Sequence, residues 1–210
     1  MKLQVAMDLL SVDDALSLLS RVAEYVDVIE LGTPLIKQEG LSAVTKIKHA
    51  YPDKIVFADM KTMDAGELEA EMAFKAGADY MTVLGVAGDS TIAGAVKAAK
   101  KHGKTVVADI IGVKDKAARV KELKALGVGL VELHAGLDEQ AESGYTIDSL
   151  LAAGKGADIP FSIAGGINVD RIGQVEDAGA AIAVAGAAIY GAKDPAAAAK
   201  ALRDKIRNHG

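Results

Sequence analysis

The sequence contains no cysteine and no tryptophan, and only 4% of its 210 residues are aromatic. Without cysteine, the chain has no disulfide framework, no thiolate nucleophile and no cysteine-ligated metal. No apolar run approaches the roughly 20 residues that a membrane-spanning helix needs. The N-terminus lacks the charged, apolar and cleavage regions of a secretory signal. These absences lead us to expect a soluble, cytoplasmic protein.

The charge balance points to small molecules as partners. The formal net charge is −5, and acidic and basic residues are interspersed along the chain. This pattern argues against a nucleic-acid partner, which requires a concentration of positive charge. It leaves room for small anions, because backbone dipoles can bind them locally. We therefore expect neither nucleic acid nor membrane among the partners.

Short apolar runs recur about every 25 residues, and each ends at a polar residue or a glycine. A helix-like segment follows each run, which favours a closed parallel barrel over an open sheet. We predict an α/β protein with a single (β/α)₈ TIM-barrel domain over residues 1–210. The eight predicted strands are Leu3–Met7, Val26–Ile29, Ile55–Ala58, Tyr80–Leu84, Thr105–Ala108, Leu130–Leu133, Pro160–Ala164 and Ile182–Ala185.

Ionisable residues stand where these predicted strands end, which is where barrel enzymes place their active sites. They are Asp8, Glu30, Asp59, Asp109 and His134, with Lys61 and Asp64 just beyond the third strand. Carboxylates gathered at one mouth repel each other and are costly to desolvate, so cations must offset them. Lys61 supplies one positive charge, and a divalent ion would supply more.

A metal site at this mouth would have oxygen ligands, since the chain has no cysteine. Oxygen ligation favours a hard cation, so we predict Mg²⁺, with Mn²⁺ as a substitute. Glu30 and Asp59 lie on neighbouring strands and form the best ligand pair. An alternative reading of any single acid here is a helix cap or a loop salt bridge.

The most specific local pattern is Asp59-Met60-Lys61-Thr62-Met63-Asp64, which places two acids around a lysine at a strand-to-helix turn. We interpret Asp59, Lys61 and Asp64 as catalytic candidates. Asp64 also has a structural reading, because Asp64 and Glu67 have the spacing of a capping box. His134 is the fourth catalytic candidate, since it ends a strand among the acids. Its structural alternative is a hydrogen-bonded core histidine.

Glycines follow the last two predicted strands. Gly165 and Gly166 come after the seventh strand, and Gly186 and Ala187 come after the eighth. Backbone N–H groups from these two loops form a phosphate-binding cradle in many barrels. Glycine lets the backbone approach the anion closely. We predict that these four residues bind the phosphate of the substrate.

Four segments resemble the orotidine-phosphate decarboxylase suprafamily, and the similarity runs from residue 1 to about residue 205. Within it, the segments are most similar to the aldolases that fix formaldehyde. The resemblance implies a TIM barrel of the ribulose-phosphate-binding type, in which ribulose 5-phosphate loses a C1 proton to give a Mg²⁺-stabilised enediolate. That species attacks formaldehyde and yields D-arabino-3-hexulose 6-phosphate. The segments are residues 6–8, 29–34, 57–64 and 132–138.

The resemblance also implies residue roles. Glu30 and Asp59 would lie on or near the metal, Asp8 and Asp109 would hold substrate hydroxyls, Lys61 would stabilise the enediolate, and His134 would shuttle the C1 proton. Asp64 would act in the site of a neighbouring subunit, making a homodimer with shared active sites. The identity of the proton acceptor stays open, because Lys61 and a metal-bound water are alternatives.

Three other functions deserve comparison. Orotidine-phosphate decarboxylase uses no metal and carries a lysine where this chain has Glu30. A 3-keto-L-gulonate 6-phosphate decarboxylase has an arginine three residues after the histidine and another after the glycine of the eighth strand. Leu137 and Ala187 stand at those positions, which favours the aldolase. A non-catalytic phosphosugar-binding barrel would not need both Lys61 and His134.

Overall fold

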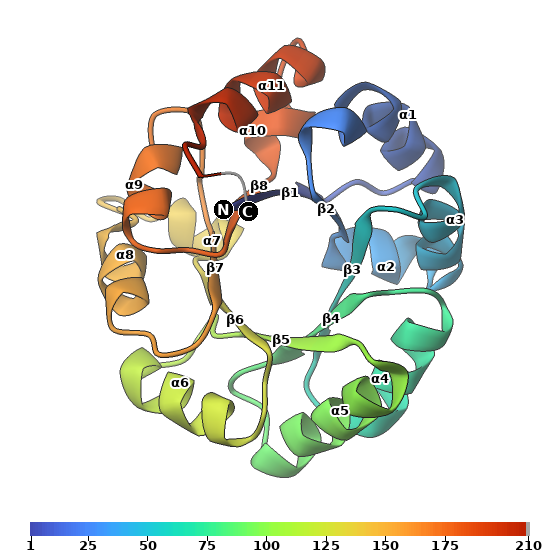
Figure 1. Ribbon diagram of the computed structural model, residues 1–210, viewed down its shortest axis with the longest axis vertical. Coiled ribbons are helices and arrows are strands. Elements are labelled where there is room, and N and C mark those ends of the chain that lie inside the picture. Colours follow the sequence, from blue (N-terminus) through green and yellow to red (C-terminus); the bar gives the residue numbers. More distant parts are fainter. Residues whose placement is uncertain (209–210) are drawn as a thin grey trace.

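The computed structural model describes residues 1–208, so the last two residues of the predicted domain lie outside it. Its strands form a closed parallel barrel in the order β1 to β8, which confirms the predicted fold class (Figure 1). Each strand is followed by an outer helix that covers the barrel. The strands are β1 (Lys2–Met7), β2 (Val28–Leu31), β3 (Ile55–Thr62), β4 (Tyr80–Leu84), β5 (Thr105–Asp109), β6 (Leu130–His134), β7 (Phe161–Ala164) and β8 (Ile182–Ala185).

The eight outer helices alternate with these strands, as expected for parallel strands joined by right-handed crossovers. They are α1 (Val12–Val22), α3 (Ser42–Ala50), α4 (Gly66–Lys75), α5 (Asp89–His102), α6 (Lys116–Ala125), α8 (Asp148–Lys155), α9 (Ile172–Asp177) and α11 (Pro195–Lys205). Four further short helices interrupt the connections within residues 1–208: η1 (Ala23–Tyr25), α2 (Thr33–Glu39), α7 (Leu137–Gln140) and α10 (Ala187–Tyr190).

All eight predicted strands are present. β4 and β8 have the predicted bounds, β1, β5, β6 and β7 differ by one residue at one end, and β2 and β3 differ by more. β2 starts two residues later than predicted and ends at Leu31, so Glu30 lies within the strand. β3 continues past Asp59 to Thr62, because a bulge between Ala58 and Thr62 keeps the chain paired with β4 after a change of register. Both acids therefore project from the sheet itself, where a side chain is held more firmly than in a loop.

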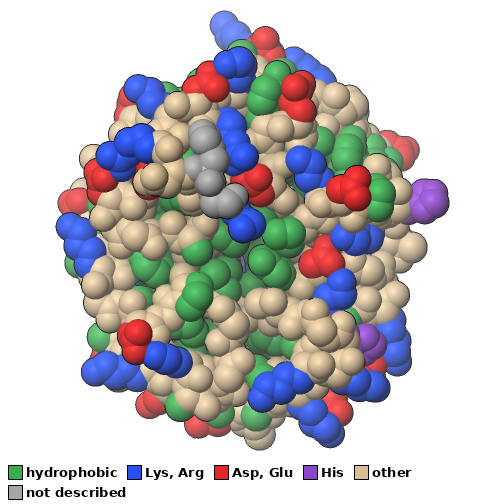
Figure 2. Space-filling view, viewed as in Figure 1, with side chains coloured by type: hydrophobic (Ala, Val, Ile, Leu, Met, Phe, Trp, Pro, Cys, Tyr) green, Lys and Arg blue, Asp and Glu red, His purple; other side chains and the backbone are tan. Residues whose placement is uncertain are grey.

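Alternate residues of each strand point into the barrel, as the period of a strand requires. An apolar cluster consists of Val28, Phe57, Val107, Leu130, Ala164, Ile182 and Val184, and it extends from the strand starts to Ala164 and Val184, which line the cavities at the mouth. In Figure 1 the N-terminus lies at the centre of the view, so the strands are seen from the side where they start. Figure 2 shows that hydrophobic side chains gather at the centre of this face, with charged side chains around the rim. The buried carboxylates lie toward the opposite end of the barrel, where the strands end.

Within residues 1–208, no helix is both long enough and apolar enough to cross a membrane. The longest, α5, has 14 residues.

Candidate active site

Five carboxylates lie at the ends of the strands that form the barrel mouth. Glu30, Asp59, Asp109 and Glu132 are buried, and Asp8 is half-buried after β1. All except Asp109 line one cavity, whose volume is about 470 Å³, together with Lys61 and His134. The structure thus brings together the predicted residues Asp8, Glu30, Asp59, Lys61 and His134, and Asp109 contacts two of them.

Lys61 owes its position to the bulge in β3. Its backbone has φ of 46°, which is uncommon for a residue other than glycine and stores strain. The backbone N–H of Lys61 donates to Thr82 Oγ1 at 2.8 Å, and that hydroxyl donates to Asp59 Oδ1 at 2.8 Å. The ammonium group then returns to Asp59 Oδ2 at 2.6 Å. Thr82 therefore holds both members of the Asp59–Lys61 pair.

Lys61 is the cation of the network. Its Nζ lies 3.2 Å from Asp109 Oδ2 in addition to its contact with Asp59. Burial lowers the pKa of Lys61, but the negative charges of Asp59, Asp109 and Glu132 outweigh that effect and raise it above its usual value. The side chain therefore remains protonated at neutral pH.

His134, the last residue of β6, pairs with Asp109, the last residue of β5. Nδ1 of His134 donates to Asp109 Oδ2 at 2.8 Å, and the other oxygen of Asp109 accepts from the backbone N–H of Ile111 at 2.8 Å. Burial lowers the pKa of His134, but the hydrogen bond and charge of Asp109 raise it to about 8. Because Nδ1 is occupied, Nε2 is the nitrogen available for proton transfer.

Two glutamates at the mouth are buried with too little positive charge nearby to offset the cost of ionising them. Burial and the charge of Asp59 raise the pKa of Glu30 well above its usual value, although Gln4 Nε2 donates to it at 2.6 Å. Burial and the charge of Asp109 raise the pKa of Glu132 in the same way. A multivalent cation would return both groups to their ionised state. The donor set, rich in carboxylate oxygen, therefore fits a hard divalent ion.

Ligand atoms of Asp109, Glu132 and His134 lie within 4.8 Å of one another, close enough to approach a common cation. Glu132 was not among the residues predicted from the sequence. Its position could have been found from the period of two that links Leu130, Glu132 and His134 along β6. The pattern was obscured because Glu132 precedes the predicted end of the strand, inside an apolar run.

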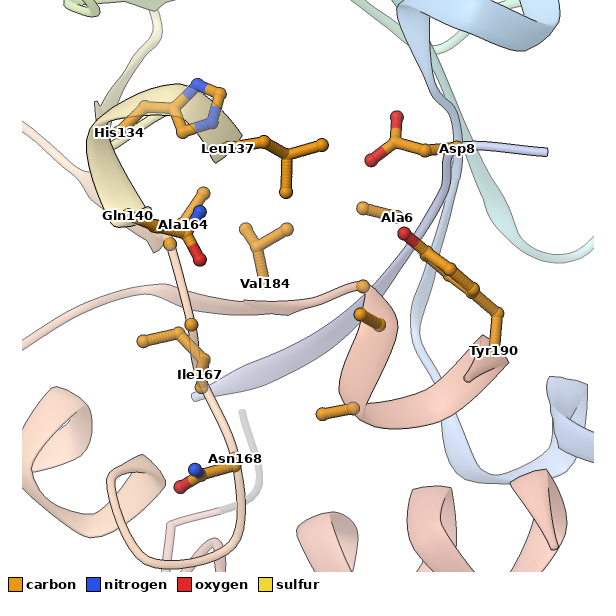
Figure 3. Close-up of a pocket in the computed structure, with 15 residues that line it drawn as sticks. Ala6, Asp8, His134, Leu137, Gln140, Ala164, Ile167, Asn168, Val184 and Tyr190 are labelled. Carbon is orange, nitrogen blue, oxygen red and sulfur yellow. The ribbon is translucent and has the colours of Figure 1, made fainter. Parts of the chain in front are cut away.

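The predicted phosphate cradle forms a second cavity, of about 290 Å³, that adjoins the first. Gly165, Gly166, Gly186 and Ala187 all line it. Asp8 and His134 line both cavities, so a molecule in the cradle can extend to the acids. Figure 3 shows Asp8 and His134 on opposite sides of this cavity, with Leu137 between them.

Tyr190 of α10 also lines the cradle, and sequence reasoning missed it. Its side chain extends toward Ala6 and Asp8 in Figure 3. Burial raises the pKa of its phenol, and the charge of Asp8 adds to that effect. A lone tyrosine five residues after a strand gives no signal by itself, because only the turn of α10 directs it inward.

Asp64 lies apart from the other candidates. Ala65, not Asp64, precedes the first residue of α4, and its left-handed backbone has φ of 52°. The Asp64 carboxylate accepts from the adjacent N–H of Ala65 at 2.7 Å, so the alternative reading of Asp64 as part of a capping box with Glu67 is wrong. The strained turn at Ala65 displaces the helix start by one residue and leaves Asp64 exposed.

Known proteins match this chain over nearly its whole length. The family described as orotidine 5'-phosphate decarboxylase / HUMPS matches residues 1–202. A 3-hexulose-6-phosphate synthase from Mycobacterium gastri is 68% identical, over 98% of this chain and 100% of the relative. A crystal structure of a 3-hexulose-6-phosphate synthase superposes with a TM-score of 0.97 at 68% identity, covering 98% of this chain and 100% of that one.

A decarboxylase is more distant. The 3-keto-L-gulonate-6-phosphate decarboxylase from Vibrio cholerae is 36% identical over 97% of this chain and 96% of its own, with a TM-score of 0.84. The chain therefore belongs to the orotidine 5'-phosphate decarboxylase / HUMPS family, and within it groups with the 3-hexulose-6-phosphate synthases.

Proposed function

We propose that this protein is an aldolase that condenses formaldehyde with D-ribulose 5-phosphate to give D-arabino-3-hexulose 6-phosphate. The observation that carries the proposal is that His134, Asp109 and Lys61 form one network beside the glycine cradle. An enediolate reaction on a phosphosugar needs a phosphate anchor, a proton acceptor and a positive charge near the developing oxyanion. The close similarity to 3-hexulose-6-phosphate synthases supports the same reaction.

In this mechanism the cradle of Gly165, Gly166, Gly186 and Ala187 binds the phosphate. The bound phosphate fixes how far the sugar extends toward the acids. Asp8 holds the hydroxyls of the sugar. Asp109, which was expected to share that role, lines neither cavity and instead holds His134 and Lys61. His134 takes the C1 proton on Nε2, because Asp109 occupies Nδ1. The electron pair left at C1 then forms the new bond to the formaldehyde carbon, and the formaldehyde oxygen takes up a proton.

Lys61 acts as a fixed positive charge and not as the base. Its raised pKa keeps it protonated, so it has no lone pair to accept the C1 proton. The contacts with Asp59 and Asp109 aim the ammonium group into the mouth. There it lowers the energy of negative charge that develops on the substrate oxygen as the proton leaves.

A divalent cation fits the mouth, and we assign it as Mg²⁺ held by Glu30 and Asp59, with Mn²⁺ as a substitute. When bound, it supplies positive charge that stabilises the oxyanion of the enediolate. A test that does not depend on activity is the melting temperature with and without Mg²⁺. Mg²⁺ should raise it for the wild type and raise it less for Glu30→Gln, and an equal rise in both would contradict this assignment.

The working form that we infer is a homodimer in which Asp64 completes the partner's site. Asp64 is exposed and caps no helix. It lies beside Met63, Leu68 and Met72, whose exposed fractions of 55%, 63% and 48% make an apolar surface on and next to α4. Such exposed apolar side chains are typical of an interface.

The proposed activity is tested by formaldehyde consumption in the presence of ribulose 5-phosphate, with Mg²⁺ and then with EDTA. Consumption that needs both the sugar phosphate and the metal supports the proposal. If formaldehyde is not consumed and 3-keto-L-gulonate 6-phosphate releases CO₂ instead, the decarboxylase is the correct assignment. Binding of ribulose 5-phosphate without either reaction would support a non-catalytic barrel.

A further inference from the structure

Side chains behind the cradle hold two consecutive carbonyls of the glycine turn after β7. Tyr145 OH donates to the carbonyl of Gly165 at 3.0 Å, and Arg171 Nη1 donates to the carbonyl of Gly166 at 3.0 Å. Gly165, Gly166 and Ile167 line the cradle, whereas in the described chain Tyr145 and Arg171 do not. Both carbonyls are therefore held by groups outside the cavity.

The direction of these carbonyls decides where the next amides point. In a trans peptide the C=O and the following N–H point in opposite directions, and the described chain has no cis peptide. With the carbonyls of Gly165 and Gly166 turned toward Tyr145 and Arg171, the N–H groups of Gly166 and Ile167 point the other way, toward the cradle. Within residues 1–208, no backbone carbonyl accepts from either amide.

Tyr145 and Arg171 approach the glycine turn so closely that a side chain at either glycine would collide with them. Gly165 and Gly166 have φ of +128° and +69°, which side chains rarely adopt. A Cβ on Gly165 would lie 2.9 Å from Tyr145 OH, and one on Gly166 would lie 2.9 Å from Arg171 Nη1. The glycines thus allow both the backbone shape and the close approach of the supports.

Each support links the cradle to a different part of the chain. Tyr145 lies between α7 and α8, in the same connection as Leu137, so the hydrogen bond ties that connection to the turn. Arg171 precedes α9, and its N–H donates to Asn168 Oδ1 at 3.1 Å. It also brings a positive charge to a cradle that has Ala187 on its other loop.

We propose that Tyr145 and Arg171 are positioning residues for phosphate binding, which hold the amides of Gly166 and Ile167 toward the anion. This inference rests on the proposed function only in that the substrate carries a phosphate. Neither residue contacts the reacting carbon. Their removal should therefore weaken binding of the phosphate group and leave the chemical step nearly intact.

The test compares Tyr145→Phe, Arg171→Gln and Arg171→Lys with the wild type. We expect Tyr145→Phe and Arg171→Gln to raise both KM for ribulose 5-phosphate and the inhibition constant of inorganic phosphate about threefold to tenfold, with kcat little changed. Arg171→Lys, which keeps the charge and a donor, should recover part of the loss. Tyr51→Phe and Arg21→Gln are matched controls, since both residues lie away from the mouth.

Unchanged KM and phosphate inhibition in Tyr145→Phe and Arg171→Gln would overturn the proposal, and so would a fall in kcat alone. Calorimetric titration with inorganic phosphate separates this inference from the proposed function. If the wild type fails to consume formaldehyde, the proposed aldolase activity is wrong. The variants must still bind phosphate more weakly than the wild type for this inference to stand. Equal phosphate affinity in all of them would again overturn it.

Discussion

Asp109 holds Nδ1 of His134 at 2.8 Å, and the same carboxylate oxygen lies 3.2 Å from Nζ of Lys61. One buried acid thus orients the proposed proton acceptor and the proposed electrostatic stabiliser together. The last residues of β5 and β6 bring Asp109 and His134 side by side, and the bulge in β3 brings Lys61 to them. The three side chains therefore meet only when β3, β5 and β6 are correctly placed relative to one another.

The first prediction concerns His134 as the proton acceptor. His134→Gln should lower kcat by about 10²- to 10⁴-fold, because glutamine cannot accept the C1 proton. Exchange of the C1 proton of ribulose 5-phosphate with solvent, followed by NMR without formaldehyde, measures this step directly. Glutamine keeps polarity at the site, so the fold should survive. Exchange at the wild-type rate would assign the proton to another group.

The pH dependence of the same step follows from the pKa of about 8. A base must be neutral to accept a proton, and His134 is protonated below that value. We therefore expect kcat/KM to rise with pH and to level off above about 8. Asp109→Asn removes the charge that raises this pKa, so the midpoint should move to lower pH while the plateau falls. A midpoint that does not move would contradict the pairing.

Subunit complementation tests the role of Asp64. Asp64→Asn and His134→Gln should each be nearly inactive as homodimers. In a mixed dimer one site carries both changes and the other carries neither. Mixing equal amounts, with mild denaturation to exchange subunits, should restore about one quarter of wild-type activity. Glu67→Gln, a neighbouring exposed acid, is the control and should be active alone. No recovery on mixing would place Asp64 within its own subunit's site or outside catalysis.

Thr82 is predicted to matter for both stability and activity. Its buried hydroxyl accepts from the N–H of Lys61 and donates to Asp59. Thr82→Val leaves both groups without this partner and should lower the free energy of unfolding by about 1–3 kcal/mol. Urea unfolding measures the loss, and kcat should fall because Lys61 is no longer held. Thr82→Ser retains the hydroxyl and should behave like the wild type in both assays.

The acid dependence of stability should depend in part on Glu176. Burial raises the pKa of Glu176, but the hydrogen bonds from Arg207 and from the backbone N–H of Asn208 outweigh that effect and bring the pKa down to about 2. A depressed carboxyl pKa stabilises the fold above the unfolded value near 4.5, and this contribution is lost as pH falls from there toward 2. Glu176→Gln should therefore lower the melting temperature at pH 7, and the difference from wild type should shrink below pH 4.5. A constant difference would contradict this assignment.

The sequence by itself determined the barrel and the composition of its mouth. Apolar runs with a fixed spacing require a repeated strand and helix, and residues at the ends of parallel strands must meet at one edge. Asp8, Asp109 and His134 could be placed in this way because each ends or follows its strand. Gly165 and Gly186 could be placed by the same rule. Local periodicity is enough for these assignments.

Only the tertiary structure decided which of these groups touch. The contacts of Asp109 with His134 and Lys61 depend on the register between strands and on the bulge at Lys61, and neither is encoded in local spacing. The same is true of Asp64, which the turn at Ala65 removes from the helix cap. Tyr145 and Arg171 reach the cradle only because separate connections pack behind it. Such contacts form between segments distant in sequence, so their geometry is set by packing and not by pattern.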